Sequence, residues 1–204
     1  MNFDHLFKIA DVSPAACVAE AGLADPALSL GQEAAATPQA FIARLVDAGL
    51  WTDAIRFLAF ALPMREGVWW ACLSARRASP DGFNGEGAEQ AAIAAAEAWV
   101  WAPVEETRRA CLAAAEAVAC DGPAGYAALA AYWTGNLAPP DKPEIPPDAR
   151  LAPTAVGAAV LLAALGRCGA EIEAHYRLAV AEALDIARGG DGRDIRAGLL
   201  ENAG

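Results

Sequence analysis

Apolar residues recur at helical spacing through most of the chain. Phe41, Ile42, Leu45 and Val46 fall on one face of a helix, and a similar stripe runs through residues 172–186. Both patterns are typical of amphipathic helices. No stretch alternates apolar and polar residues over a useful strand length. The pattern therefore predicts an all-α fold.

The apolar pattern and its breaks predict about eight or nine helices in a single domain that spans residues 1–204. Short turns between successive stretches favour antiparallel hairpins. The predicted helices cover residues 14–22, 37–49, 52–62, 64–78, 88–102, a stretch from Pro103 onward, 123–133, 153–165 and 171–188.

A proline stands at the start of five predicted helices. These prolines are Pro14, Pro38, Pro103, Pro123 and Pro153. The first turn of a helix tolerates proline because its amide needs no partner there and its fixed φ suits the helix. The repeated proline therefore marks helix starts rather than breaks.

The first 36 residues form a predicted N-terminal docking segment. Phe7 lies in a short apolar patch near its beginning, and residues 24–36 are expected to form a loop with Pro26 and Gly31 as breakers.

Two later segments also lack the helical pattern. Residues 138–153 hold six of the thirteen prolines, which predicts an extended, proline-rich crossing. Its prolines also match the spacing of a polyproline ligand, so connector and ligand both remain open. Residues 189–204 are glycine-rich and polar, and we expect a flexible tail.

A faint internal repeat links two predicted helices. Residues 71–75 resemble residues 110–114 at an offset of 39 residues. Helical repeat arrays have periods of this length but need at least about three copies. Repeat-like hairpins therefore remain an alternative description of the same all-α fold.

The composition favours closely packed helices. The chain contains 54 alanines, which have the highest helix propensity and let helices approach one another. The net charge of −11 opposes binding to phosphate backbones and to anionic lipid surfaces. We therefore expect no nucleic-acid partner, whereas a basic protein partner would suit the charge.

The cysteines and the apolar runs bear on localisation. Five cysteines at wide spacing, without a Cys-x-x-Cys motif, predict reduced thiols in a cytoplasmic protein. The N-terminus lacks the pattern of an export signal. The longest uncharged apolar run, residues 155–166, falls short of the ~20 residues that span a bilayer. We expect no membrane insertion.

No motif carries recognisable chemistry. His5 and His175 are the only histidines, and no metal site of known spacing can be built with them. Glu105 and Glu106 lie at a helix start, where the helix dipole alone favours acidic residues. The sequence predicts no catalytic residue, no metal and no cofactor.

Two clusters of aromatic and polar residues are candidates for partner binding. Trp69 and Trp70 point about 100° apart on a helix, so one is expected in the core and the other in a groove or at a partner. Trp133 closes a helix end before Gly135. The candidate partner-binding residues are Arg65, Glu66, Trp69, Trp70, Trp133 and Asn136.

Three segments together resemble a known family. They are Arg65–Cys72 (REGVWWAC), Ala131–Asn136 (AYWTGN) with the prolines after it, and Pro153–Ala159 (PTAVGAA). Over about residues 40–164 the chain resembles an uncharacterised family of alanine-rich bacterial proteins associated with type VI secretion gene clusters. The resemblance implies an accessory role in loading or handling a secreted effector, and it transfers no catalytic residue.

Three functional hypotheses follow. The first is a non-enzymatic interaction protein, a secretion-associated adaptor or chaperone with a protein partner. The second is an immunity protein that covers a cationic toxin with its acidic surface. The third is a helical enzyme with an unrecognised site.

Overall fold

The computed structural model describes residues 1–204 except 33–36, 80–86, 140, 167–171, 194 and 196–204. The described part contains ten α-helices, one short 3₁₀ helix and no strand, which confirms the all-α prediction. The contacts cluster in two compact units, residues 1–63 with 167–204 (unit 1) and residues 64–166 (unit 2). Each unit is described separately.

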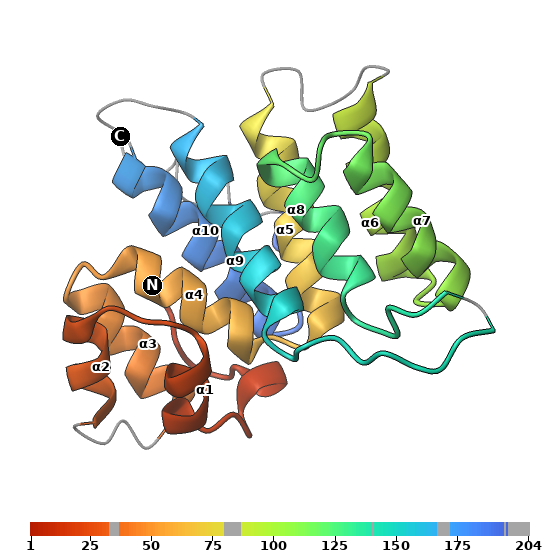
Figure 1. Ribbon diagram of the computed structural model, residues 1–204. Helices are drawn as coiled ribbons and strands as arrows, with labels where there is room; N and C mark the ends of the chain where they lie inside the picture. The colour runs from red at the N-terminus through yellow and green to blue at the C-terminus, as the bar shows by residue number, and fades with distance from the viewer. Residues whose placement is uncertain (33–36, 80–86, 140, 167–171, 194, 196–204) are drawn as a thin grey trace. The chain divides into compact units, whose positions relative to one another are not determined.

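Unit 1 is built from segments at both ends of the chain (Figure 1). Its helices are η1 (Phe7–Ile9), α1 (Pro14–Glu20), α2 (Asp25–Gln32), α3 (Pro38–Asp47), α4 (Trp51–Ala61) and α10 (Ile172–Ala187). Helix α4 packs against α1, α3 and α10. Phe41 of α3 and Phe57 of α4 meet edge to face in the core of unit 1, with ring centroids 4.9 Å apart.

Helix α2 corrects the prediction of a loop at residues 24–36. Asp53 of α4, itself buried, accepts a hydrogen bond from the backbone N–H of Ala24 (2.9 Å), and Arg56 donates to the carbonyl of Gly22 (3.2 Å). Pro26 lies in the first turn, where proline is tolerated. The sequence pattern missed this helix because its cap comes from another helix. With α2, the α-helices in the described residues number ten, against the predicted eight or nine.

The predicted docking segment at residues 1–36 is only partly exposed over the residues that the structure describes. Leu6 and Ile9 are buried, whereas Phe7 is 67% exposed and stacks on His5 with ring centroids 5.8 Å apart. The predicted flexible tail at 189–204 lies mostly outside the described residues.

The five prolines that are predicted to mark helix starts all lie within one turn of a helix start. Pro14 and Pro38 are the first residues of their helices, and Pro123 is the second residue of α8 (Gly122–Tyr132). Pro103 precedes α7 (Glu105–Glu116) by two residues, and Pro153 is the third residue of α9 (Leu151–Leu165). The two deviations are confined to one turn.

Unit 2 is an up-and-down bundle of α5 (Met64–Ala78), α6 (Ala88–Trp101), α7, α8 and α9. Helix α8 packs against the other four. Its buried face is almost all alanine and glycine, which lets neighbouring backbones approach closely. Gly67 of α5 likewise faces Val156 of α9, whose side chain would lie 3.5 Å from an added Cβ.

The two similar pentapeptides fall in α5 and α7, and both contain a fully buried cysteine, Cys72 and Cys111. A repeat architecture stays a prediction.

The bundle has two ends. One end carries the start of α5, the turn between α6 and α7 (residues 102–104), and the connection between α8 and α9 (residues 133–150); we call it the loop end (Figure 1). The opposite end carries the turn between α7 and α8 (residues 117–121). Of the predicted proline-rich crossing at 138–153, the described residues up to Arg150 contain no helix, whereas residues 151–153 belong to α9.

Candidate functional site

The connection between α8 and α9 is longer than its geometry requires. These two helices pack directly against each other, and neighbouring helices in bundles are usually joined by about 2–8 residues. Here the connection takes eighteen residues, 133–150. Loops of this length without secondary structure are uncommon and are often functional.

Asn136 ties the ends of this connection together. Its Oδ1 accepts hydrogen bonds from the backbone N–H groups of Ala138 (3.0 Å) and Ile145 (2.8 Å). The N–H of Leu137 donates to the carbonyl of Ile145 at 2.9 Å. Residues 136–145 therefore form a closed loop, which we call the Asn136 loop.

The tip of the Asn136 loop is a tight turn. The N–H of Lys142 donates to the carbonyl of Pro139 at 3.2 Å, and Asp141 adopts a left-handed φ of 68°. Aspartate tolerates this conformation better than most non-glycine residues. The turn leaves Asp141, Lys142 and Glu144 exposed.

Arg108 of α7 holds the base of the loop. Its side chain is almost fully buried, and its Nη1 and Nη2 donate to the carbonyls of Tyr132 and Asn136. The guanidinium also lies 5.1 Å from the centroid of the Tyr132 ring. Gly135 makes room for it, because a Cβ there would lie 3.0 Å from Arg108 Nε.

Glu105 and Arg109 complete this cluster. Glu105 accepts hydrogen bonds from Arg108 Nε (2.8 Å) and Arg109 Nε (2.5 Å), and Arg109 Nη2 donates to the carbonyl of Ala138 (2.6 Å). The hydrogen bond from Arg108 is the main cause that lowers the pKa of Glu105 to about 2, and Arg109 adds to it. Glu105 and Arg109 lie four residues apart on α7, a spacing that favours this ion pair.

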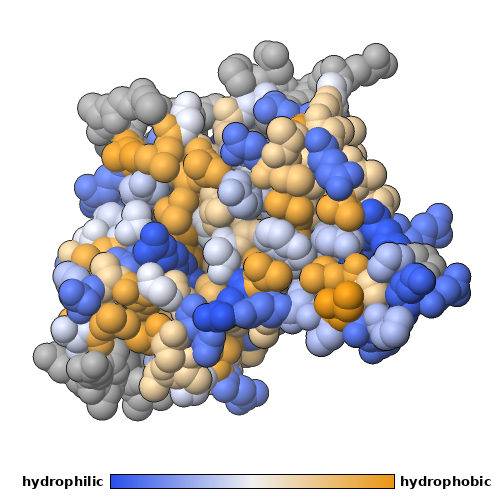
Figure 2. Space-filling model, in the orientation of Figure 1, coloured by the Kyte–Doolittle hydropathy of each residue, from blue (hydrophilic) through white to orange (hydrophobic). Residues whose placement is uncertain are grey.

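The loop end exposes three large apolar side chains. Trp101 is 71% exposed, Val104 54% and Ile145 55%. Together they make up half of the six large apolar residues that are exposed in the described part of the chain. Figure 2 shows hydrophobic atoms beside hydrophilic ones at this end of unit 2. Exposed tryptophan is a common anchor in protein interfaces.

The opposite placement of Trp99 and Trp101 agrees with their sequence spacing. Trp99 is buried in the bundle, whereas Trp101, two residues later, points outward. Residues two apart on a helix point about 200° apart, so both indoles cannot face the same core.

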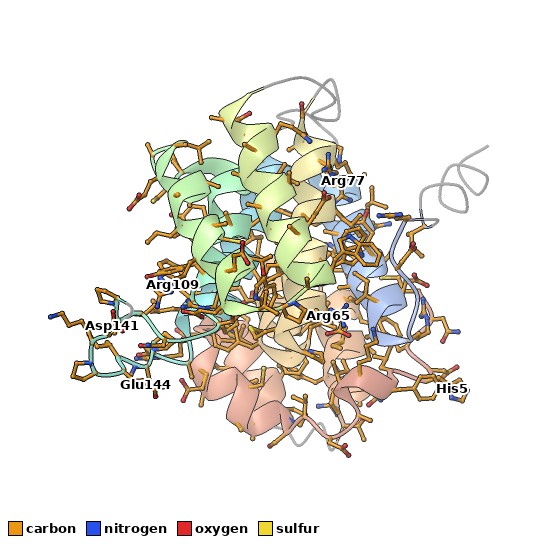
Figure 3. All side chains as sticks on the ribbon, turned by 90° about the vertical axis from the view of Figure 1, so that its right-hand side faces the viewer. His5, Arg65, Arg77, Arg109, Asp141 and Glu144 are labelled. Atoms are coloured by element: carbon orange, nitrogen blue, oxygen red, sulfur yellow. The ribbon has the colours of Figure 1, made fainter. Side chains whose placement is uncertain are left out.

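The exposed charges at the loop end are mostly acidic. Glu106, Asp141 and Glu144 are exposed, and none of them has an ion pair with another described residue. Figure 3 shows Arg109 next to the loop that carries Asp141 and Glu144. Arg109 itself is engaged by Glu105 and by the loop backbone.

The six predicted partner-binding residues all lie near the loop end. Trp70 is completely buried, so the folded chain offers no Trp70 surface to a partner, and this residue belongs to the core. Trp69 and Glu66 are half-buried in the first two turns of α5. Arg65 is exposed, and its Nε donates to the carbonyl of Val100 at the end of α6 (2.6 Å).

Trp133 and Asn136 follow α8 and are both half-buried. Asn136 positions the loop that bears its name rather than capping helical carbonyls. The structure therefore brings the predicted residues to one end of one bundle, with mainly structural roles for Asn136 and Trp70.

Sequence reasoning missed Trp101, Ile145 and Arg108 as parts of this site. The spacing of Trp99 and Trp101 implies that one indole is exposed, but it does not tell which residues lie beside that indole. Arg108 was missed because two adjacent arginines in the first turn of a helix usually face solvent. Nothing in the local sequence indicates that this arginine is buried.

The described residues contain no cluster of three or more His, Cys, Asp or Glu residues that could hold a metal ion. Burial raises the pKa of the thiols of Cys17 and Cys111 to about 12, which disfavours the reactive thiolate. Among the described helices, none has the length and apolar character of a membrane span.

The chain belongs to DUF6931, a family of unknown function, whose model matches residues 41–187. The matched range contains the whole of unit 2, including the loop end. No curated protein and no solved structure matches the chain.

Proposed function

We propose that this chain is a non-enzymatic protein-interaction module that holds its partner at the loop end of unit 2. The observation that carries the proposal is the Asn136 loop, because its length exceeds what the helices need and three side chains hold it in place. Arg108, Arg109 and Asn136 supply those contacts. A connector without a further role would need neither the length nor the contacts.

The chemistry of the loop end supports binding rather than turnover. The buried polar groups there, such as the guanidinium of Arg108, are engaged in structural hydrogen bonds. The exposed groups include an indole, two aliphatic side chains, and charged groups of which most are carboxylates. This mixture suits a protein interface, in which apolar anchors lie within a polar rim.

We further propose that the module is a cytoplasmic adaptor or chaperone for an effector of a type VI secretion system. This part rests on the resemblance of three segments, residues 65–72, 131–136 and 153–159. In the structure all three lie toward the loop end, at the start of α5, the end of α8 and the start of α9. The segments that carry the resemblance therefore also build the proposed site.

An immunity protein for a cationic toxin is the second candidate. The carboxylates of Glu106, Asp141 and Glu144 favour it, because they would complement a basic surface. A toxin complex driven by such charges should weaken steeply as salt is added, whereas an apolar chaperone contact should not.

Affinity capture from the native bacterium tests the proposal. The wild-type chain should retain an effector or toxin, identified by mass spectrometry, and the Trp101→Ala and Asn136→Ala variants should lose most of it. Trp101→Ala should leave the melting temperature nearly unchanged, because exposed positions usually alter stability by less than about 0.5 kcal/mol.

Phe7→Ala is the matched control, since Phe7 is an aromatic residue of unit 1 with similar exposure. The proposal fails if both loop-end variants retain the partner, or if Phe7→Ala loses it to the same extent. Turnover of a small metabolite by the purified chain would support the enzyme hypothesis instead.

A further inference from the structure

We infer that the loop end recognises a basic segment of a partner protein, in which lysine or arginine side chains flank an apolar residue. The inference rests on the proposed function and specifies the chemistry of the partner. It follows from which charges at the loop end are engaged within the chain and which are not.

Three arginines of the loop end face inward or bind the backbone, and a fourth, Arg150, forms an exposed ion pair with Asp148 (2.6 Å). Arg65 donates a hydrogen bond to the carbonyl of Val100, and the buried Arg108 donates to the carbonyl of Tyr132. Arg109 donates to the carboxylate of Glu105 and to the carbonyl of Ala138. Their positive charge is therefore directed to groups of unit 2 itself. An acidic partner would find few free cations to bind.

The free charges at this end are three carboxylates and one ammonium group, that of Lys142. Glu106 lies on the first turn of α7, beside the exposed Val104, and Asp141 and Glu144 flank Lys142 at the tip of the Asn136 loop. No ion pair joins these carboxylates to any described residue. They remain available to cations of a partner.

Trp101 adds a second means of recognising a cation. Its indole is the most exposed large apolar side chain in the described part of the chain. A lysine or arginine over an indole face gains a cation–π interaction, which strengthens when a nearby carboxylate binds the same group. The aliphatic side chains of Val104 and Ile145 would receive an apolar residue between the cations.

Peptide titration tests this chemistry with the full chain. The probes are a synthetic peptide with leucine and lysine at helical spacing, and the same peptide with glutamate in place of every lysine. Calorimetry at low salt should detect binding of the lysine peptide only. The Asp141→Asn/Glu144→Gln variant should weaken that binding roughly fivefold, since each exposed ion pair contributes modestly, and Trp101→Ala should weaken it as well.

Glu89→Gln/Glu116→Gln is the control, because it removes the same charge from exposed positions at the opposite end of unit 2. It should bind the lysine peptide like the wild type. The inference is wrong if this control loses as much affinity as the loop variant, since binding would then reflect only the net charge. It is also wrong if the glutamate peptide binds equally well.

The two proposals can fail separately. If capture of the native partner depends on Trp101 but the lysine peptide does not bind, the proposed function stands and the basic partner is excluded. If both Trp101→Ala and Asn136→Ala retain the native partner, the proposed function fails whatever the peptide does.

Discussion

The two ends of unit 2 join neighbouring helices in different ways. At one end, five residues (117–121) connect α7 to α8. The N–H of Cys120 bonds to the carbonyl of Ala115 at 2.7 Å, and Ala119 and Cys120 adopt left-handed φ values of 56° and 55°. The turn passes close to α8, since a Cβ at Gly125 would lie 3.1 Å from the backbone of Cys120.

At the loop end, the connection between neighbouring helices is long. Eighteen residues join α8 to α9 where far fewer would suffice, and a buried arginine together with Asn136 holds them. The short turn accepts backbone strain to close two helices, which is a purely structural task. The long loop uses side chains to hold an exposed segment in one conformation, and this difference is the reason for proposing the loop end as the binding site.

The largest expected effect comes from removing the group that holds the long loop. Arg108→Ala leaves the buried carbonyl of Tyr132 and that of Asn136 without their donor, which should cost about 2–4 kcal/mol of unfolding free energy. Urea unfolding measures this loss of unfolding free energy. Hydrogen exchange should also show that the backbone amide of Ile145 exchanges faster in the variant.

Arg109→Ala provides the comparison, because it removes a single bond to the loop from a more exposed side chain. It should cost less than about 1 kcal/mol. Equal losses in the two variants would show that the buried position of Arg108 has no special importance for the loop.

A smaller effect of opposite sign is expected at the short turn. Ala119→Gly should raise the unfolding free energy by about 0.5–1 kcal/mol, because glycine relieves the left-handed strain and Ala119 is exposed. Asp141→Gly should gain less, about 0.3 kcal/mol, since aspartate already tolerates this conformation. A loss of stability in Ala119→Gly would contradict the assignment of strain to the short turn.

The smallest effect concerns pH. The pKa of Glu105 falls from 4.5 to about 2 on folding, mainly through the hydrogen bond from Arg108. Its contribution to stability is therefore fully present above pH 4.5 and is lost as the pH falls through about 2. Thermal melts should fall more steeply across this window for the wild type than for Glu105→Gln. Parallel curves would show that the ion pair adds nothing to the stability of the loop end.

Much of the fold could be predicted from the sequence because its helices are amphipathic and their starts carry proline. The start of α3 at Pro38 shows this, with Thr37 accepting a hydrogen bond from Ala40 N–H at 3.2 Å. Helix α2 escaped prediction because Asp53, 29 residues away in the sequence, accepts the hydrogen bond at its start. Local patterns contain no information about such a distant cap.

The candidate site was predictable only in outline. Asn136 and Trp69 were selected from residue types, and the structure places both toward the loop end. The role of Asn136 depends on Ile145, nine residues later, and on Arg108 of another helix. These contacts arise from the packing of α7 against α8, which periodicity alone does not specify.

The fit between Gly135 and Arg108 also restricts how this family can vary. A side chain at position 135 would displace the guanidinium, whose nearest atom lies 3.0 Å from an added Cβ. Among related chains, a larger residue at position 135 should therefore occur together with a shorter residue at position 108. Such paired replacement would identify members in which the loop between α8 and α9 is no longer held by an arginine.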